Sequence, residues 1–103
     1  MITHWRSNFA NSSLPFVFVL LAPDEKANAV ADIRTAQLAA LSLPRTAVVN
    51  AMDDGDCTPS YCAVHVRDKQ LIGQRLSDVL LGLLYGEGAE AAQTAVATGW
   101  TPT

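Results

Sequence analysis

The stretch Pro15-Phe16-Val17-Phe18-Val19-Leu20-Leu21 decides the fold class of this chain. It is β-branched, aromatic and apolar at both alternating sets of positions, so neither face of the expected strand is polar. Strands of this kind are typical of parallel sheets that helices cover on both sides. Pro23 ends the stretch, because proline has no N–H to donate to a sheet. We therefore expect a buried strand of an α/β protein.

The segment after this strand predicts a helix from Glu25 to about Leu41. Asp24 is a suitable N-cap residue, and apolar side chains recur at helical spacing behind it. Arg34 falls in the middle of that apolar face, with Gln37 beside it. Two interpretations of Arg34 remain open. Its guanidinium either extends past the edge of the core or forms an ion pair or hydrogen bond with a neighbouring loop.

The remaining segments complete the expected order of elements. Residues 46–52 predict a second short buried strand, and residues 53–61 are rich in Asp, Gly, Pro and Ser, which is typical of a loop. Residues 67–84 return to helical periodicity, with Gly86 as a natural end. Residues 87–103 are small and polar, and we expect this tail to be poorly ordered.

The resulting order is strand, helix, strand, loop, helix. Two strands joined through a helix usually form a parallel βαβ unit with a right-handed crossover. Two strands alone cannot bury both faces of a strand as apolar as residues 15–21. We therefore predict an α/β fold that is a partial doubly wound, flavodoxin-like parallel sheet: the βαβ-loop-α portion that ends a larger domain.

Composition and charge exclude several function classes. The formal net charge is −3, and the seven Lys and Arg residues are scattered. They form neither a basic stripe for nucleic acid nor a polybasic membrane patch. The longest apolar run, residues 14–22, is far shorter than the roughly 20 residues that span a bilayer. No Gly-rich phosphate loop follows the first strand, which argues against a nucleotide-binding domain.

His65 is the candidate general base. In open α/β sheets, functional groups collect beyond the carboxyl ends of the strands, and the loop that carries His65 leaves the second strand at that end. Its ordinary pKa, about 6.5, suits proton transfer at neutral pH. The alternative interpretation is an ordinary surface histidine, which a single loop histidine more often is.

Acidic residues and cysteines share this loop. One of Asp53, Asp54 and Asp56 could orient the imidazole by accepting its ring N–H, or all three could be solvated carboxylates in turns. Cys57 and Cys62 could form a local disulfide, which would imply an oxidising compartment, or remain free thiols. With His65 they offer only three potential metal ligands, so no metal site is predicted.

A series of short motifs follows one another along the chain in a recognisable order. They are Trp5-Arg6, Pro15-Phe16-Val17-Phe18-Val19, Arg34 with Gln37, Leu41-Ser42-Leu43-Pro44, His65-Val66-Arg67-Asp68-Lys69-Gln70, Arg75-Leu76 and Tyr85-Gly86. This ordered set resembles the sialate O-acetylesterase family. The resemblance implies an SGNH-type hydrolase fold, with residues 1–86 as the C-terminal portion of its catalytic domain.

The resemblance also implies a reaction and a substrate. Members of the family remove O-acetyl esters from sialic acids by acyl transfer, in which a serine attacks the acetyl carbonyl and a histidine takes its proton. His65 matches the family's catalytic histidine. The expected ligand is an acetylated sialic acid or a related acetylated sugar, with no metal or organic cofactor. A lysosomal or extracellular location is expected on the same ground.

The chain departs from the family pattern in important places. It contains no Gly-Gln-Ser-Asn type motif for the nucleophile, so we expect no activity from the chain alone. Cys62 occupies the position where related hydrolases place the acid, three residues before the histidine. Two hypotheses remain open. The rest of the esterase domain, in the same parent chain or in a partner subunit, supplies the serine, or the chain is a non-catalytic remnant or small interaction module.

Overall fold

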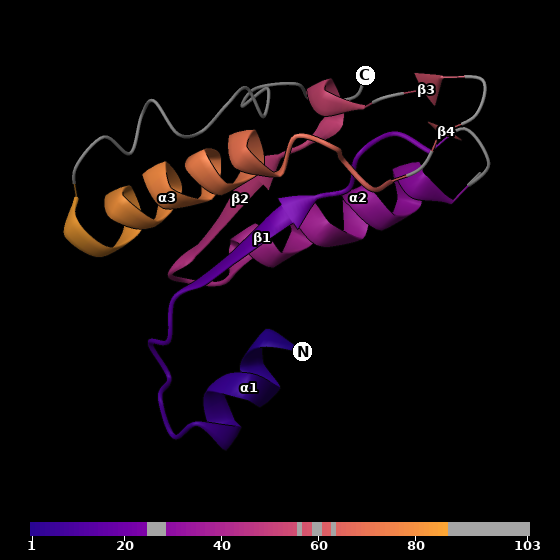
Figure 1. Ribbon diagram of the computed structural model, residues 1–103. Helices are drawn as coiled ribbons and strands as arrows, with labels where there is room; N and C mark the ends of the chain where they lie inside the picture. Colours follow the sequence, from indigo (N-terminus) through magenta and orange to yellow (C-terminus); the bar gives the residue numbers. More distant parts are fainter. Residues whose placement is uncertain (25–28, 56, 59–60, 63, 87–103) are drawn as a thin grey trace, which may run out of the picture.

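The computed structural model describes residues 1–24, 29–55, 57–58, 61–62 and 64–86. The main elements follow an α/β order (Figure 1): α1 (Ile2–Asn8), β1 (Phe16–Leu20), α2 (Val30–Ala39), β2 (Thr46–Asn50) and α3 (Lys69–Tyr85). Short 3-10 turns, η1 (Ala40–Ser42) and η2 (Met52–Asp54), follow α2 and β2, and the two-residue strands β3 (Cys57–Thr58) and β4 (Tyr61–Cys62) come after η2.

β1 and β2 form a parallel pair, as the sequence predicts. The register runs from Phe16 opposite Thr46 to Leu20 opposite Asn50. The pair begins where the Phe16 N–H donates to the carbonyl oxygen of Arg45, at 3.0 Å. Both strands are rich in Val and Phe or Thr, which fit a pleated surface packed on both sides. The α/β fold class with a parallel sheet is therefore confirmed.

Helices cover both faces of this pair (Figure 1). Successive side chains of a strand point to opposite faces, and the contacts follow that alternation. Val17 and Val49 pack with Val79 of α3 on one face. On the other face, Phe16 and Phe18 lie opposite α2. Val49 is 0% exposed, and burying such a side chain stabilises the fold by about 1.5–3 kcal/mol.

The two strands differ in how completely they are covered. Val48 and Val49 of β2 are buried, whereas Phe16, Val17, Phe18 and Val19 of β1 are only half-buried. β1 is thus enclosed by helices on its faces, but less completely than the apolar sequence predicts. Within the described residues, only one of its two edges is paired with a strand.

The helix ends follow local chemistry. The Asp68 carboxylate caps α3 by accepting the Leu71 N–H at 2.9 Å, and Gly86 ends it in the left-handed region at φ 74°. α2 begins at Val30 with Ala29 as its N-cap, later than the predicted start at Glu25, and residues 25–28, on which the predicted cap at Asp24 would act, lie outside the described part. The chain is still in contact with the sheet beyond β1, since Ala22 is buried in the core.

β2 ends earlier than predicted, because Asn50 turns the chain. Its side-chain Oδ1 accepts the Met52 N–H at 2.8 Å, which starts η2 in place of two more strand residues. The following segment, predicted as a loop, contains the antiparallel pair β3–β4, in which Cys57 lies opposite Cys62 along the backbone. The predicted disulfide concerns side chains outside the described part. The tail at residues 87–103 also lies outside it.

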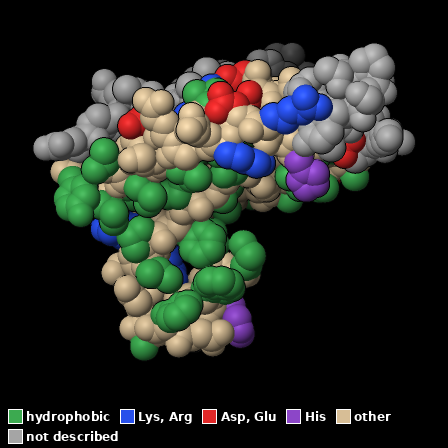
Figure 2. All heavy atoms as spheres, viewed as in Figure 1, with side chains coloured by type: hydrophobic (Ala, Val, Ile, Leu, Met, Phe, Trp, Pro, Cys, Tyr) green, Lys and Arg blue, Asp and Glu red, His purple; other side chains and the backbone are tan. Residues whose placement is uncertain are grey.

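α1 is tied to the amino end of the sheet by a buried arginine. Arg6 donates from Nε and Nη2 to the Leu14 carbonyl at 3.0 and 2.9 Å, and from Nη2 to the Pro44 carbonyl at 2.6 Å. The Trp5 ring meets Phe16 edge-on, with centroids 6.1 Å apart. Figure 2 shows apolar side chains over α1 and the lower part of the molecule, while acidic groups gather mostly in the upper part.

Candidate functional site

The candidate site lies at the carboxyl ends of β1 and β2, where two segments meet. The chain beyond β1 reaches Pro23, and the chain beyond η2 reaches Gly55. The two residues are so close that a Cβ at Gly55 would come within 2.9 Å of the Pro23 ring. Gly55 has ordinary extended dihedral angles, so the space beside Pro23, not the backbone conformation, favours glycine there.

A small apolar floor supports this end of the sheet. Ala22, Ala51, Val66 and Ile72 are buried together, with Val19 and Leu76 packed against them. A cavity of about 250 Å³ opens beside this cluster, lined by residues from the end of β1, by Ala51, by Val64 and Val66, and by the start of α3. The floor fixes the positions of the segments on which polar side chains are carried.

His65 stands between two anchored valines. Val66 is buried in the floor and Val64 is half-buried along the cavity, whereas His65 itself is exposed. The alternation places the imidazole on the outer side of a segment whose neighbours point inward. The structure therefore puts His65 beside the carboxyl ends of both strands, where the sequence predicts it. Its role as a general base stays a prediction.

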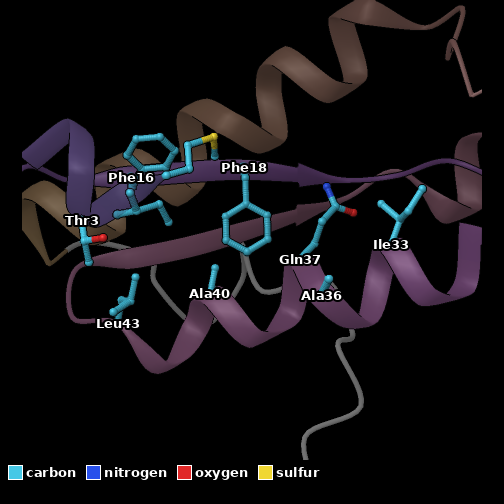
Figure 3. Close-up of a pocket in the computed structure, with 10 residues that line it drawn as sticks. Thr3, Phe16, Phe18, Ile33, Ala36, Gln37, Ala40 and Leu43 are labelled. Carbon is cyan, nitrogen blue, oxygen red and sulfur yellow. The ribbon is translucent and has the colours of Figure 1, made fainter.

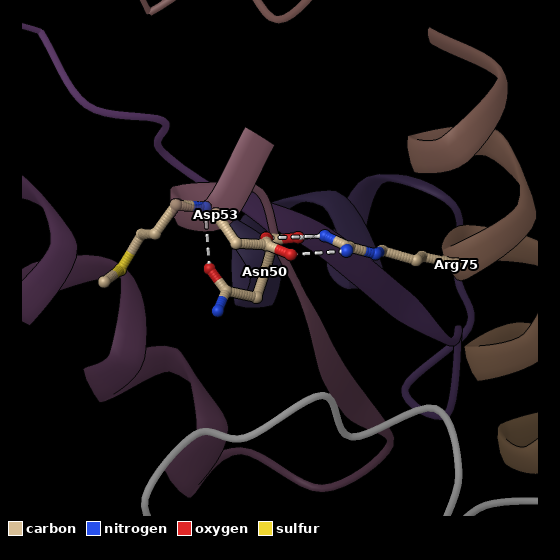
Figure 4. A network of polar contacts seen from close by, with 4 residues as sticks. Asn50, Asp53 and Arg75 are labelled. Atoms are coloured by element: carbon tan, nitrogen blue, oxygen red, sulfur yellow. Dashed lines mark hydrogen bonds and ion pairs between the residues drawn. The ribbon is translucent and has the colours of Figure 1, made fainter. Parts of the chain in front are cut away.

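Asp53 is held by an arginine from α3 (Figure 4). Arg75 donates from Nη1 to Asp53 Oδ1 at 2.7 Å and from Nη2 to Oδ2 at 2.6 Å. The same Nη1 donates to the Asn50 carbonyl at 2.7 Å. This fork binds η2 and the end of β2 to α3. Because the Asp53 side chain is 56% exposed, the ion pair stabilises the fold by at most about 1 kcal/mol.

Arg75 also sets the charge of this carboxylate. Its hydrogen bonds, and to a smaller extent its positive charge, hold the pKa of Asp53 below the ordinary value, while partial burial opposes them. The hydrogen bond with Asp53 likewise raises the pKa of Arg75. The Asp53 carboxylate is therefore held in one position, and each of its two oxygens accepts a hydrogen bond from Arg75.

The other predicted orienting acids have different surroundings. Asp54 is half-buried, and its Oδ2 atom is buried without a hydrogen-bond partner among the described residues. Asp56 lies outside the described part of the chain. Of the two acids that the structure describes, Asp53 is thus engaged by Arg75, whereas Asp54 forms no ion pair with a described residue. Which acid orients the imidazole stays a prediction.

Arg34 and Gln37 bind the backbone that follows β1. Arg34 Nε donates to the Leu21 carbonyl at 2.7 Å. Gln37 accepts the Leu21 N–H at 3.1 Å and donates to the Val19 carbonyl at 2.9 Å. Of the two interpretations of Arg34, the hydrogen bond to a neighbouring segment is correct, because Nε donates to the Leu21 carbonyl, while Nη2 is buried without a hydrogen-bond partner among the described residues.

Serines and metal ligands complete the comparison with the sequence. Ser12 and Ser13 precede β1, Ser42 donates to the Ala39 carbonyl at 2.9 Å, and Ser77 is exposed on α3; Ser60 lies outside the described residues.

Over the described ranges, no three His, Cys, Asp or Glu residues cluster as metal ligands. No helix of the described part is long and apolar enough to cross a membrane.

Sequence reasoning missed the roles of two arginines. Arg6 and Arg75 belong to the quoted motifs, but nothing local predicts their partners. Arg75 reaches Asp53 across 22 positions and Arg6 reaches Pro44 across 38. The available signal was the type of residue, since an arginine near an apolar segment needs acceptors for its donors. The identity of those acceptors depends on the tertiary fold.

Comparison with known proteins yields a structural relative. No protein-family model matches the chain, and no curated protein matches it significantly. Among solved structures, a carbohydrate acetylesterase from Xanthomonas citri superposes with a TM-score of 0.70 at 30% identity, over 84% of this chain. The chain spans 21% of that protein's length. The described fold is thus similar to about a fifth of a carbohydrate acetylesterase.

Proposed function

We propose that this chain forms the histidine-bearing part of a carbohydrate acetylesterase. The observation that carries the proposal is the likeness to such an enzyme over 84% of the chain, at 30% identity and a TM-score of 0.70. The position of His65 agrees with it, because functional groups of α/β sheets collect beyond the carboxyl ends of the strands. The exposed imidazole is accessible there to a substrate.

In the proposed reaction, His65 is the general base. It takes the proton of a serine hydroxyl as the serine oxygen attacks the acetyl carbonyl, and it returns that proton to the departing sugar oxygen. Hydrogen-bond donors hold the negative oxygen of the tetrahedral intermediate. Water then cleaves the acetyl-serine, with His65 again as base, and acetate leaves. Asp54 or Asp56 would orient the imidazole, since Arg75 engages Asp53.

The serine and the oxyanion donors would come from the rest of an esterase domain, in the same parent chain or in a partner subunit. The described serines lie on α1, before β1, in η1 or on α3, and none stands in a Gly-Gln-Ser-Asn type motif, which supports this division. An O-acetylated sialic acid is the substrate that the family resemblance favours, and a lysosomal or extracellular location follows from the same resemblance. Neither a metal nor an organic cofactor enters the proposed reaction.

A chimera tests the proposal. In it, the present chain replaces the similar segment of the Xanthomonas citri acetylesterase, and hydrolysis of para-nitrophenyl acetate is followed. We expect the chimera to be active and the isolated chain to be inactive. The His65→Ala substitution should lower kcat of the chimera by about 10³-fold or more.

His4→Ala is the matched control, because His4 is also an exposed histidine but lies on α1. It should leave kcat unchanged. A chimera whose activity survives His65→Ala would remove His65 from the reaction. A folded chimera without activity would instead favour the non-catalytic interaction module.

A further inference from the structure

The turn between α1 and β1 carries a sequence pattern that the proposed reaction does not use. Asn11-Ser12-Ser13 has the form Asn-Xaa-Ser with a residue other than proline in the middle, which is the acceptor pattern for N-linked glycosylation. The residue two positions after every other asparagine of the sequence has no hydroxyl group. Those asparagines are Asn8, Asn28 and Asn50. Whether Asn11 is a usable acceptor depends on how the turn presents it.

Backbone hydrogen bonds hold this turn in place at the surface. The Asn11 N–H donates to the Arg6 carbonyl at 2.9 Å, and the Asn11 carbonyl accepts the Leu14 N–H at 3.3 Å. Arg6 is itself buried and donates to the Leu14 carbonyl, so the turn is tied to the fold on both sides. Residues 9–13 are nonetheless all exposed. Folding thus leaves the acceptor pattern accessible, as a bulky glycan requires.

The Asn11 side chain leaves its amide nitrogen available. Its Oδ1 accepts hydrogen bonds from the Ser13 N–H and from the Ser13 hydroxyl, each at 3.1 Å. Its Nδ2, the atom to which a sugar is attached in N-linked glycosylation, has no hydrogen-bond partner among the described residues. The turn therefore brings the amide and the hydroxyl of the acceptor pattern together and keeps both at the surface.

The surroundings of the turn have room for a sugar. An open hollow of about 550 Å³ borders the turn, lined in part by Thr3 and Ser7 of α1 and by Asn11 and Ser12. Phe9, at the end of α1, is 65% exposed, and an apolar hollow of about 490 Å³ lies between α1, β1 and α2 (Figure 3). Because large exposed apolar patches are uncommon in soluble proteins, a hydrophilic oligosaccharide on this turn would make this end of the molecule more soluble.

The turn lies at the opposite end of the β1–β2 pair from the candidate site. It precedes the amino end of β1, whereas His65 lies beside the carboxyl ends of both strands (Figure 1). A glycan at Asn11 therefore leaves the carboxyl ends of the strands open to a substrate. Glycosylation and ester hydrolysis are compatible in one molecule, and neither requires the other.

We infer that Asn11 is the attachment site of an N-linked oligosaccharide, whose donor is a lipid pyrophosphate that carries the oligosaccharide. Nδ2 forms a bond to the anomeric carbon of the first sugar, and the bond between that carbon and the pyrophosphate oxygen breaks. The lipid pyrophosphate leaves with the bonding electron pair, and Nδ2 releases one proton to a base of the transferring enzyme. The inference goes beyond the proposed function, and it implies that the chain enters a compartment that holds such donors.

Mass spectrometry of the protein from its source cells tests the inference without a variant. Trypsin cleaves after Arg6 and Lys26 and releases residues 7–26, which contain both Asn8 and Asn11. Peptide-N-glycosidase in water labelled with heavy oxygen converts a glycosylated asparagine into labelled aspartate. We expect the label at Asn11 and none at Asn8, which is also exposed but lacks the acceptor pattern. An unglycosylated peptide, or a label that appears without the glycosidase, would overturn the inference.

Three substitutions in the full chain, produced in the same cells, separate the modification from the structure of the turn. Ser13→Ala removes the hydroxyl and should abolish the label, whereas Ser13→Thr keeps a hydroxyl and should retain it. Asn11→Asp keeps an oxygen that accepts both Ser13 hydrogen bonds but has no amide nitrogen to receive the sugar. It should lose the glycan while circular dichroism shows the same fold. A glycan that persists in Ser13→Ala, or that is lost from Ser13→Thr, would contradict the assignment.

The outcomes also separate this inference from the proposed function. Asn11→Asp should leave kcat of the chimera unchanged, because the turn lies at the end of the strands opposite to His65. An active chimera together with an unmodified Asn11 in the source protein would remove the inference alone. A glycosylated Asn11 together with a folded but inactive chimera would remove the proposed function alone.

Discussion

Each end of the β1–β2 pair is closed by an arginine, but the two arginines bind different partners. At the amino end, Arg6 is only 7% exposed and donates to main-chain carbonyls. At the carboxyl end, Arg75 donates to the exposed carboxylate of Asp53 as well as to a carbonyl. The amino end is thus a buried structural contact, whereas the carboxyl end carries exposed polar side chains.

The difference explains why chemistry is expected at only one end. A guanidinium has five N–H donors and no acceptor, so Arg6 can satisfy carbonyls of Leu14 and Pro44 together and join α1 to both strands. At that end, Nε and Nη2 of Arg6 donate to main-chain carbonyls of the chain itself. At the other end, the segments that carry His65 and the acidic side chains are anchored by a buried cluster that includes Val66 and Ile72.

The largest effect is expected from loss of the Arg6 hydrogen bonds at the amino end of the β1–β2 pair. Arg6→Ala should lower the free energy of unfolding by about 3 kcal/mol, because it leaves more than one carbonyl oxygen without its donor in a buried place. Urea denaturation followed by circular dichroism measures the change. Arg6→Lys, with its single compact ammonium group, should recover only part of the loss. A loss well below 1 kcal/mol would show that this end is not the main joint.

The second largest effect is expected where the segment after β1 meets the segment after η2. Gly55→Ala places a methyl group within 2.9 Å of the rigid Pro23 ring, so the two segments must separate slightly. We expect a loss of about 1 kcal/mol in the free energy of unfolding and a lower kcat of the chimera.

Gly73→Ala is the matched control for that substitution. Nothing lies within 4 Å of a Cβ at Gly73, which is exposed within α3. It should stabilise the chain by about 0.5–1 kcal/mol, since alanine favours helix over glycine. If both substitutions changed stability in the same direction, the contact of Gly55 with Pro23 would not control the carboxyl end.

The smallest expected effect concerns charge at the carboxyl end. Asp53→Asn keeps the shape of the side chain but removes its charge, and it should cost less than about 1 kcal/mol at pH 7. Because Arg75 lowers the folded-state pKa of Asp53, its stabilisation is fully present above the ordinary carboxyl pKa of about 3.9. It is lost as pH falls through the lowered value.

Thermal denaturation of the unaltered chain and the Asp53→Asn variant between pH 2 and 7 measures this difference. The two melting temperatures should converge at the acidic end of the range. A difference that stayed constant down to pH 2 would mean that the charge of Asp53 contributes nothing to the clamp with Arg75.

Much of the candidate site was predictable from local signals. The loop after β2 and the position of His65 follow from chain order, because parallel strands place their carboxyl ends together. The role of Asp53 was not predictable. Its partner Arg75 lies on the far side of the β3–β4 segment in sequence, and only the packing of α3 against β2 brings the two side chains together.

The sequence by itself determined the elements that depend on neighbouring residues. Apolar runs specify the two parallel strands, Asp68 and Gly86 set the ends of α3, and the position after β2 places His65. The tertiary structure alone decided which polar groups meet. The partners of Arg6, Arg75 and Gln37 depend on contacts between segments distant in the chain, which no local pattern encodes.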